Sequence, residues 1–145
     1  MEMIGDILKA KGDQVFSVGP ETKTTEALAL MAEKNIGAVL VVDEFHTIQG
    51  IFSERDFARK IVQSQKAPPE IQVKELMTTK IYYIRTEQTI EECMALMTRN
   101  KFRHMPVLHE GKLAGLVSIG DIVKTLISEK DYMIDQLEHY ISGSL

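Results

Sequence analysis

The sequence predicts a mixed α/β protein, of the α/β or α+β class, built from two βαββα repeats that pack as a pseudo-two-fold pair within one chain. Three observations lead to this prediction. Residues 1–62 and 73–128 show the same order of apolar and polar segments. Short alternating runs indicate strands, and apolar residues spaced by three and four positions indicate helices. Because each half is too small to be comfortably stable alone, we expect one cooperative unit.

The internal repeat is clearest when residues 15–18 are aligned with residues 81–84. The same alignment places Ala-Leu-Met at 29–31 on Ala-Leu-Met at 95–97. Further matches are residues 50–53 with 115–118, after a one-residue deletion, and residues 4–8 with 73–77. Few positions are identical, but apolar classes agree along nearly the whole repeat. Duplication of one unit is the best interpretation.

The elements follow in one order in both repeats. They are a strand (15–18; 81–84), a threonine-rich turn (22–25; 86–89), a helix, two strands (38–42 and 48–52; 105–108 and 113–117) and a helix that begins near Asp56 or Asp121. Hydroxyls of the turn can cap the helix that follows. That helix carries an apolar stripe in both copies: Ala27, Leu28 and Met31, then Ile90, Cys93, Met94 and Met97. Cys93 and the methionines are therefore expected in the core.

The two repeats are joined by residues 63–72, which we interpret as a linker. Adjacent Pro68 and Pro69 stiffen this segment and remove two amide donors, so it is expected to be a surface connector. The predicted organisation is a first repeat at 1–62, the linker, a second repeat at 73–128 and a C-terminal helix at 129–145.

The C-terminal helix carries an apolar stripe with no counterpart in the repeat. The stripe consists of Met133, Ile134, Leu137, Tyr140 and Ile141. It either packs back on the repeats or meets a second subunit, and we expect a homodimer.

Composition excludes several classes of function. A net charge of −4 argues against general nucleic-acid binding, which needs a concentrated basic surface. The apolar runs are too short for a membrane span, the N-terminus does not resemble a signal peptide, and Cys93 is the single cysteine. The four histidines show no spacing typical of a zinc site. We expect a cytoplasmic protein that binds no membrane, no nucleic acid and no metal.

Two segments, Gly-Ile-Phe-Ser-Glu-Arg-Asp at 50–56 and Gly-Leu-Val-Ser-Ile-Gly-Asp at 115–121, share the form G-h-h-S-x-x-D, in which h is apolar. Each closes a strand and opens a helix, and each follows an apolar strand. This combination resembles the CBS domain, which occurs as tandem pairs called Bateman modules. The resemblance covers residues 4–127 and implies a stand-alone regulatory CBS pair of bacterial or archaeal type.

The resemblance implies an adenosine-containing ligand such as AMP, ADP, ATP, NAD(H) or S-adenosylmethionine. The Asp of S-x-x-D would hold the ribose diol, because a carboxylate can accept hydrogen bonds from both hydroxyls. The Ser would bond a phosphate or ribose oxygen, and the helix N-terminus after it favours phosphate. Ribose-binding Asp56 and Asp121 and phosphate- or ribose-binding Ser53 and Ser118 are thus the candidates.

In paired CBS domains each cleft combines S-x-x-D of one copy with the strand and turn of the other. Cleft A would join Ser53, Arg55 and Asp56 with Ile84, Thr86, Thr89, Arg103, His104 and Met105. Cleft B would join Ser118 and Asp121 with Val18, Thr22, Thr24, Ala38 and Val39. Because Arg55, Arg103 and His104 fall in cleft A, we expect the phosphate there. Cleft B, with Lys124 as its one candidate cation, would be empty or take a less charged group.

Other interpretations of these residues stay open. The two aspartates can be helix caps, the arginines solvated surface charges and His104 a packing residue. The chain as a whole can be a ligand-free interaction or dimerisation domain. The sequence shows no glycine-rich phosphate loop, nucleophile elbow or Cys-His pair, so we do not expect an enzyme or a catalytic residue. A protein effector that receives the signal is also expected.

Overall fold

A computed structural model describes residues 2–142 of the chain. The chain forms two compact units, one of residues 14–82 and one of residues 1–13 with 83–145. We call them the first-repeat unit and the second-repeat unit, and describe each by itself. No helix among the described residues has both the length and the apolar character needed to cross a membrane.

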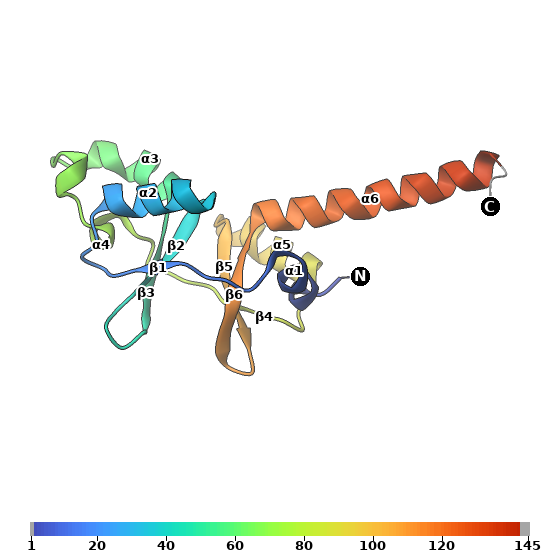
Figure 1. Cartoon of the computed structure of the whole chain (residues 1–145), viewed down its shortest axis with the longest axis horizontal. Coiled ribbons are helices and arrows are strands. Elements are labelled where there is room, and N and C mark those ends of the chain that lie inside the picture. Colours follow the sequence, from blue (N-terminus) through green and yellow to red (C-terminus); the bar gives the residue numbers. More distant parts are fainter. Residues whose placement is uncertain (1, 143–145) are drawn as a thin grey trace. The chain divides into compact units, whose positions relative to one another are not determined.

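The first-repeat unit contains a three-stranded sheet in the order β1-β2-β3. Its elements are β1 (Ser17–Val18), α2 (Thr24–Lys34), β2 (Ala38–Val42), β3 (Ile48–Ser53), α3 (Glu54–Lys60), two 3₁₀ turns (Ile61–Gln63 and Pro68–Glu70) and α4 (Val73–Leu76). β1 runs parallel to β2, and β2 pairs antiparallel with β3, with Leu40 opposite Ile51. The apolar run of β2 is buried because the helices cover it (Figure 1).

The second-repeat unit repeats this topology with the order β4-β5-β6. Its elements are α1 (Ile4–Lys11), β4 (Ile84–Arg85), α5 (Ile90–Asn100), β5 (His104–His109), β6 (Lys112–Ser118) and α6 (Ile119–Ser142). β4 is parallel to β5, and β5 pairs antiparallel with β6, with Val107 opposite Gly115. The predicted mixed α/β class is confirmed.

The first helix of each sequence repeat packs in the other repeat's unit. In the first-repeat unit, the amides of Val73 and Lys74 donate to the carbonyls of Thr22 (2.8 Å) and Pro20 (3.0 Å). In the second-repeat unit, the amides of Ile4 and Gly5 donate to Gln88 (2.9 Å) and Thr86 (2.9 Å) in the equivalent way. The repeats seen in the sequence and the units of the fold therefore have different boundaries.

Each unit has its own apolar core. In the first-repeat unit the core joins α2, the sheet and α4: Ala27, Met31, Val39, Val41, Phe52, Ile71, Val73 and Leu76. In the second-repeat unit Ile90, Cys93 and Met97 of α5 and Met105 and Val107 of β5 are all buried, and Cys93 Sγ lies 3.9 Å from Met105 Sδ. The expected core placement of Cys93 is confirmed, and burial raises the pKa of its thiol to about 11.

Three local expectations need correction. Thr89 caps α5, accepting from the Glu92 amide at 3.1 Å, but the N-cap of α2 is Lys23, whose side chain makes no cap bond. The linker is not wholly a surface segment, because Ile71 is fully buried in the core. The C-terminal helix is the continuation of α6, which runs without a break from Ile119 to Ser142.

Candidate functional site

Ser53 and Asp56 form a reciprocal cap at the start of α3. The Ser53 hydroxyl accepts from the Asp56 amide at 3.0 Å, and the Asp56 Oδ2 accepts from the Ser53 amide at 3.0 Å and from its hydroxyl at 3.0 Å. β3 ends at Ser53 in extended backbone, so the strand delivers the cap directly to the helix. The interpretation of Asp56 as a helix cap is confirmed, and the cap contacts occupy its Oδ2 oxygen.

The second oxygen of Asp56 points to groups outside the cap. Its Oδ1 accepts from the Thr78 hydroxyl at 2.9 Å and lies 3.3 Å from the Lys60 ammonium, which also donates to the Leu76 carbonyl at 2.8 Å. A carboxylate offers about four acceptor positions, and these contacts use all of them. A ribose diol would therefore have to replace Thr78 or Lys60.

Ser118 and Asp121 repeat the cap at the start of α6. The Asp121 amide donates to the Ser118 hydroxyl at 3.1 Å, and the Ser118 amide donates to Asp121 Oδ2 at 2.8 Å. The Lys11 ammonium, at the end of α1, reaches the same Oδ2 at 2.8 Å and the Leu116 carbonyl at 2.9 Å. Burial by itself raises the pKa of Asp121, but the bonds from Lys11 and Ser118 outweigh it, and the pKa lies below its usual value.

Both aspartates are thus tied to a segment that comes from the other sequence repeat. Thr78 follows α4 and bonds Asp56, whereas Lys11 ends α1 and bonds Asp121. The sequence-based candidates do not include Lys11, Lys60 or Thr78. Lys60 stands four residues after Asp56 on one helix, a spacing that was visible in the sequence. The other two come close only through the exchange of helices.

The cationic candidates of cleft A belong to different elements of the two units. Arg103 is exposed and, with Lys124, lines a shallow hollow of about 590 Å³ beside Ile119, Val123 and Ile127. The sequence predicts Arg103 and Lys124 in different clefts, but within this unit they share one hollow. His104 pairs with Ser118 across β5 and β6, and Arg55 is half-buried at the start of α3.

Several side chains assigned to the adenine pockets lie inside their units. Ile84, Met105, Val39 and Thr24 are fully buried and Ala38 nearly so. Thr24 donates its hydroxyl to the Pro68 carbonyl at 3.1 Å. Any ligand contact at these positions would run through the backbone rather than the side chain.

The remaining pocket candidates are more accessible. Val18 and Thr22 are half-buried, and Thr22 offers its carbonyl to Val73. The Thr86 hydroxyl lies 2.8 Å from His109 Nδ1 and donates to Glu87 at 3.0 Å. Cleft A and cleft B each combine residues of both units. That the residues of each cleft come together therefore stays a prediction.

A second hollow, of about 460 Å³, lies between α1 and α6 of the second-repeat unit. Lys11, Asp121 and Lys124 line it together with Thr125, Ser128 and Tyr132. It brings the S-x-x-D aspartate, two ammonium groups and three hydroxyls together. Among the described residues no group of three or more His, Cys, Asp or Glu is placed to hold a metal ion.

Comparison with known proteins shows the family. The CBS domain matches residues 4–63 and again residues 73–128. The chain therefore belongs to the CBS domain family and carries two copies of the domain.

Individual relatives agree with this assignment. The CBS domain-containing protein CBSX3, mitochondrial, of Arabidopsis thaliana is 32% identical over 97% of this chain and 72% of its own length. A solved CBS domain structure, NE2398, is 43% identical, covers 88% of this chain and 99% of its own, and superposes with a TM-score of 0.82. The CBS domain pair of MJ0100, solved with 5′-methylthioadenosine and S-adenosyl-L-methionine, is 19% identical over 89% of this chain and 98% of its own, with a TM-score of 0.76, and so shares the fold.

Proposed function

We propose that this chain is a regulatory CBS-domain pair that binds an adenosine-containing ligand through Asp56, Asp121 or both. The observation that carries the proposal is the repeated arrangement of the two aspartates. Each is the reciprocal cap of a helix that follows a strand, and each also bonds a side chain from an exchanged segment. The MJ0100 domain pair, which binds two adenosine compounds, supports the class of ligand.

The chemistry suits a ribose diol. The cap holds each carboxylate in one orientation, so little freedom remains to be lost when a ligand binds. Two vicinal hydroxyls can replace the ammonium or hydroxyl that now bonds the carboxylate, through charge-assisted hydrogen bonds of about 1.5–3 kcal/mol each. The displaced Lys60 or Lys11 ammonium would remain beside the ligand, where a phosphate could accept from it.

These lysines favour a phosphate-bearing ligand such as AMP, ADP, ATP or NAD(H). From the sequence, Arg55, Arg103 and His104 favour cleft A for the phosphate. Lys11 beside Asp121 gives the second S-x-x-D a cation of its own. We therefore propose that both aspartates can accept a phosphorylated ligand, with the order of affinity to be measured.

The proposed regulation follows from the exchanged helices. A ligand that takes Asp121 from Lys11, or Asp56 from Thr78, removes a bond that holds the first helix of the other repeat. Its differential affinity for the held and released arrangements would shift their populations. The signal would pass to a protein effector or between subunits of a homodimer.

A thermal-shift and calorimetric titration tests the proposal. AMP, ADP, ATP, NAD and S-adenosylmethionine are each added at millimolar concentration to the full chain. Ligand at 100 times its Kd stabilises the folded state by about 2.7 kcal/mol, so a clear rise in Tm is expected for at least one compound. No shift and no heat with any of them would favour a ligand-free interaction domain, in which the aspartates serve only as caps.

A further inference from the structure

The last half of α6 carries an apolar face that nothing else in the described part of the second-repeat unit covers. The first turns of α6 pack on α1, α5 and β6, and Ile122 there is fully buried. Beyond Glu129 every described side chain is exposed. The large apolar ones, Met133, Ile134, Leu137, Tyr140 and Ile141, are between 51% and 82% exposed. Figure 1 shows this part of α6 extending beyond the sheet of its own unit.

The exposed face follows a seven-residue repeat. Apolar pairs recur at Leu126-Ile127, Met133-Ile134 and Tyr140-Ile141, with Val123 three residues before the first pair and Leu137 three residues before the last. In a heptad written abcdefg, the pairs occupy positions d and e, and Val123 and Leu137 occupy position a. This is the pattern of a helix that packs along another helix. The position between Val123 and Leu137 is Lys130. The family match ends at residue 128, so the exposed half of this stripe lies outside the shared fold.

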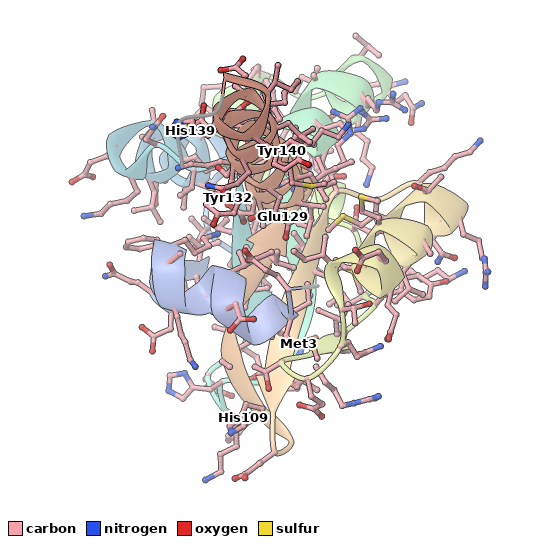
Figure 2. The ribbon with its side chains drawn as sticks, turned by 90° about the vertical axis from the view of Figure 1, so that its right-hand side faces the viewer. Met3, His109, Glu129, Tyr132, His139 and Tyr140 are labelled. Carbon is pink, nitrogen blue, oxygen red and sulfur yellow. The ribbon has the colours of Figure 1, made fainter. Side chains whose placement is uncertain are left out.

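The charges on this segment narrow the choice of partner. The polar face carries Glu129, Asp131, Asp135 and Glu138, whereas Lys130 lies on the apolar stripe. An acidic polar face does not suit an anionic lipid surface, which binds helices with basic polar faces. Figure 2 looks along α6 and shows Glu129, Tyr132, His139 and Tyr140 projecting from it.

We propose that this segment pairs with the same segment of a second copy of the chain, in antiparallel orientation. In a parallel, in-register pair, the two Lys130 ammonium groups would face each other at one a position and repel. In an antiparallel pair centred near Asp135, Lys130 lies against Tyr140 of the second copy, twice by symmetry. The ammonium then lies over an aromatic ring, and Met133 meets Leu137 in the centre.

The size of the face sets the expected strength. A helix of about 14 residues is about 21 Å long, which gives less contact than the roughly 800 Å² per partner of a standard interface. Pairing through this face alone is therefore expected to have a Kd in the micromolar range. In the unpaired chain, an exposed segment of this length is only marginally stable as a helix. Pairing should therefore raise its helix content.

Sedimentation equilibrium of the full chain between 1 and 500 μM tests the pairing, with Leu137→Glu as the disrupting variant. The matched control is Gln136→Glu, which adds the same charge beside the stripe. We expect a concentration-dependent dimer whose Kd rises at least tenfold in Leu137→Glu and changes little in Gln136→Glu. A chain that stays monomeric, or a dimer that Leu137→Glu leaves unchanged, overturns the proposal. Both sites are exposed, and an unchanged Tm confirms that the units remain folded.

Cysteine cross-linking tests the orientation. In a Cys93→Ala background, Lys130→Cys and Tyr140→Cys chains are prepared separately and oxidised alone or mixed. The antiparallel pair predicts disulfides mainly in the mixture. Efficient cross-linking of Lys130→Cys with itself would overturn the antiparallel arrangement.

Discussion

The Lys11 ammonium lies 2.8 Å from Asp121 Oδ2 and ties the end of α1 to the start of α6 within the second-repeat unit. The same ammonium donates to the Leu116 carbonyl at 2.9 Å on β6. One side chain from the first sequence repeat thus fastens a strand and a helix of the second. If Asp121 binds a ligand through Oδ2, this bond is the contact that the ligand would replace.

Replacing Lys11 with Met should separate these two roles. The ion pair is partly exposed, so its loss is expected to lower the free energy of unfolding by about 0.2–1 kcal/mol. Denaturant unfolding measures this change, and Lys9→Met, on an exposed part of α1, is the control. If the proposed function holds, the affinity at Asp121 for an unphosphorylated adenosine compound should rise, because no ammonium competes. An equal loss of stability in both variants would show that the Lys11 contact has no specific role.

Stability should fall in acid partly because of Asp121. Its folded-state pKa lies below the ordinary value of 3.8, so the carboxylate stabilises the fold at neutral pH, and this contribution is lost as the pH falls through the folded pKa. Asp121→Asn should be less stable than the wild type at pH 7, and the difference should shrink from about pH 4 downwards. Urea unfolding at several pH values measures this. A difference that stays constant from pH 7 to pH 2 would contradict the assignment.

Asp56→Asn should weaken ligand binding more than it weakens the fold. The amide keeps one acceptor oxygen, which can serve either the cap or the Thr78 side, but its NH2 group cannot accept, so the cap and both ribose hydroxyls can no longer be bonded at once. We expect at least a tenfold loss of affinity by calorimetry for a ligand at this site. Glu54→Gln, also in the first turn of α3 and exposed, makes the same change of charge and serves as the control. Equal binding by both variants would contradict ribose binding at Asp56.

Gly50 and Gly115 are equivalent glycines with unequal tolerance for a side chain. A Cβ at Gly50 would lie 2.8 Å from the Thr78 carbonyl oxygen and 2.7 Å from Met77 Sδ, whereas a Cβ at Gly115 would meet only the flexible Leu8 side chain, at 2.7 Å. Gly50→Ala should therefore destabilise the protein by about 1–3 kcal/mol, and Gly115→Ala by less. Thermal unfolding of the two variants compares them directly. A larger loss for Gly115→Ala would mean that Leu8 is held as rigidly as backbone.

Cys93 should react slowly with thiol reagents. It is fully buried, and burial raises its pKa to about 11, so almost no thiolate exists at pH 7.5. Alkylation by iodoacetamide in native buffer is expected to be at least a hundredfold slower than in 6 M guanidinium. Fast labelling of the native protein would show that α5 opens readily.

Much of the fold could be predicted because it depends on local patterns. The continuous apolar run in residues 38–42 is typical of a buried strand, and the stripe through Ile90, Cys93 and Met97 reflects the period of a helix. The duplication likewise predicted that Ser53 and Ser118 would occupy equivalent positions. Both became caps of the helices that follow, because a cap needs only residues three positions apart.

The exchange of helices could not be predicted, because it depends on which surface buries the most apolar area. Ile4 and Val73 begin their sequence repeats, yet each is buried in the unit of the other repeat. No local pattern distinguishes a helix that packs on its own sheet from one that packs on its neighbour's. The partners of the two aspartates, Thr78 and Lys11, follow from this exchange.

The sequence alone thus determined the repeat, the order β-α-β-β-α within it, the family resemblance and the two S-x-x-D aspartates, since all of these depend on residue type and short spacing. Tertiary structure decided that Asp56 faces Thr78 and Lys60, that Asp121 faces Lys11, and that the stripe of α6 stays uncovered within the described part of its own unit. These contacts join residues that are far apart in sequence. Their existence depends on how whole elements pack, which is a balance of burial and hydrogen bonding that no short segment records.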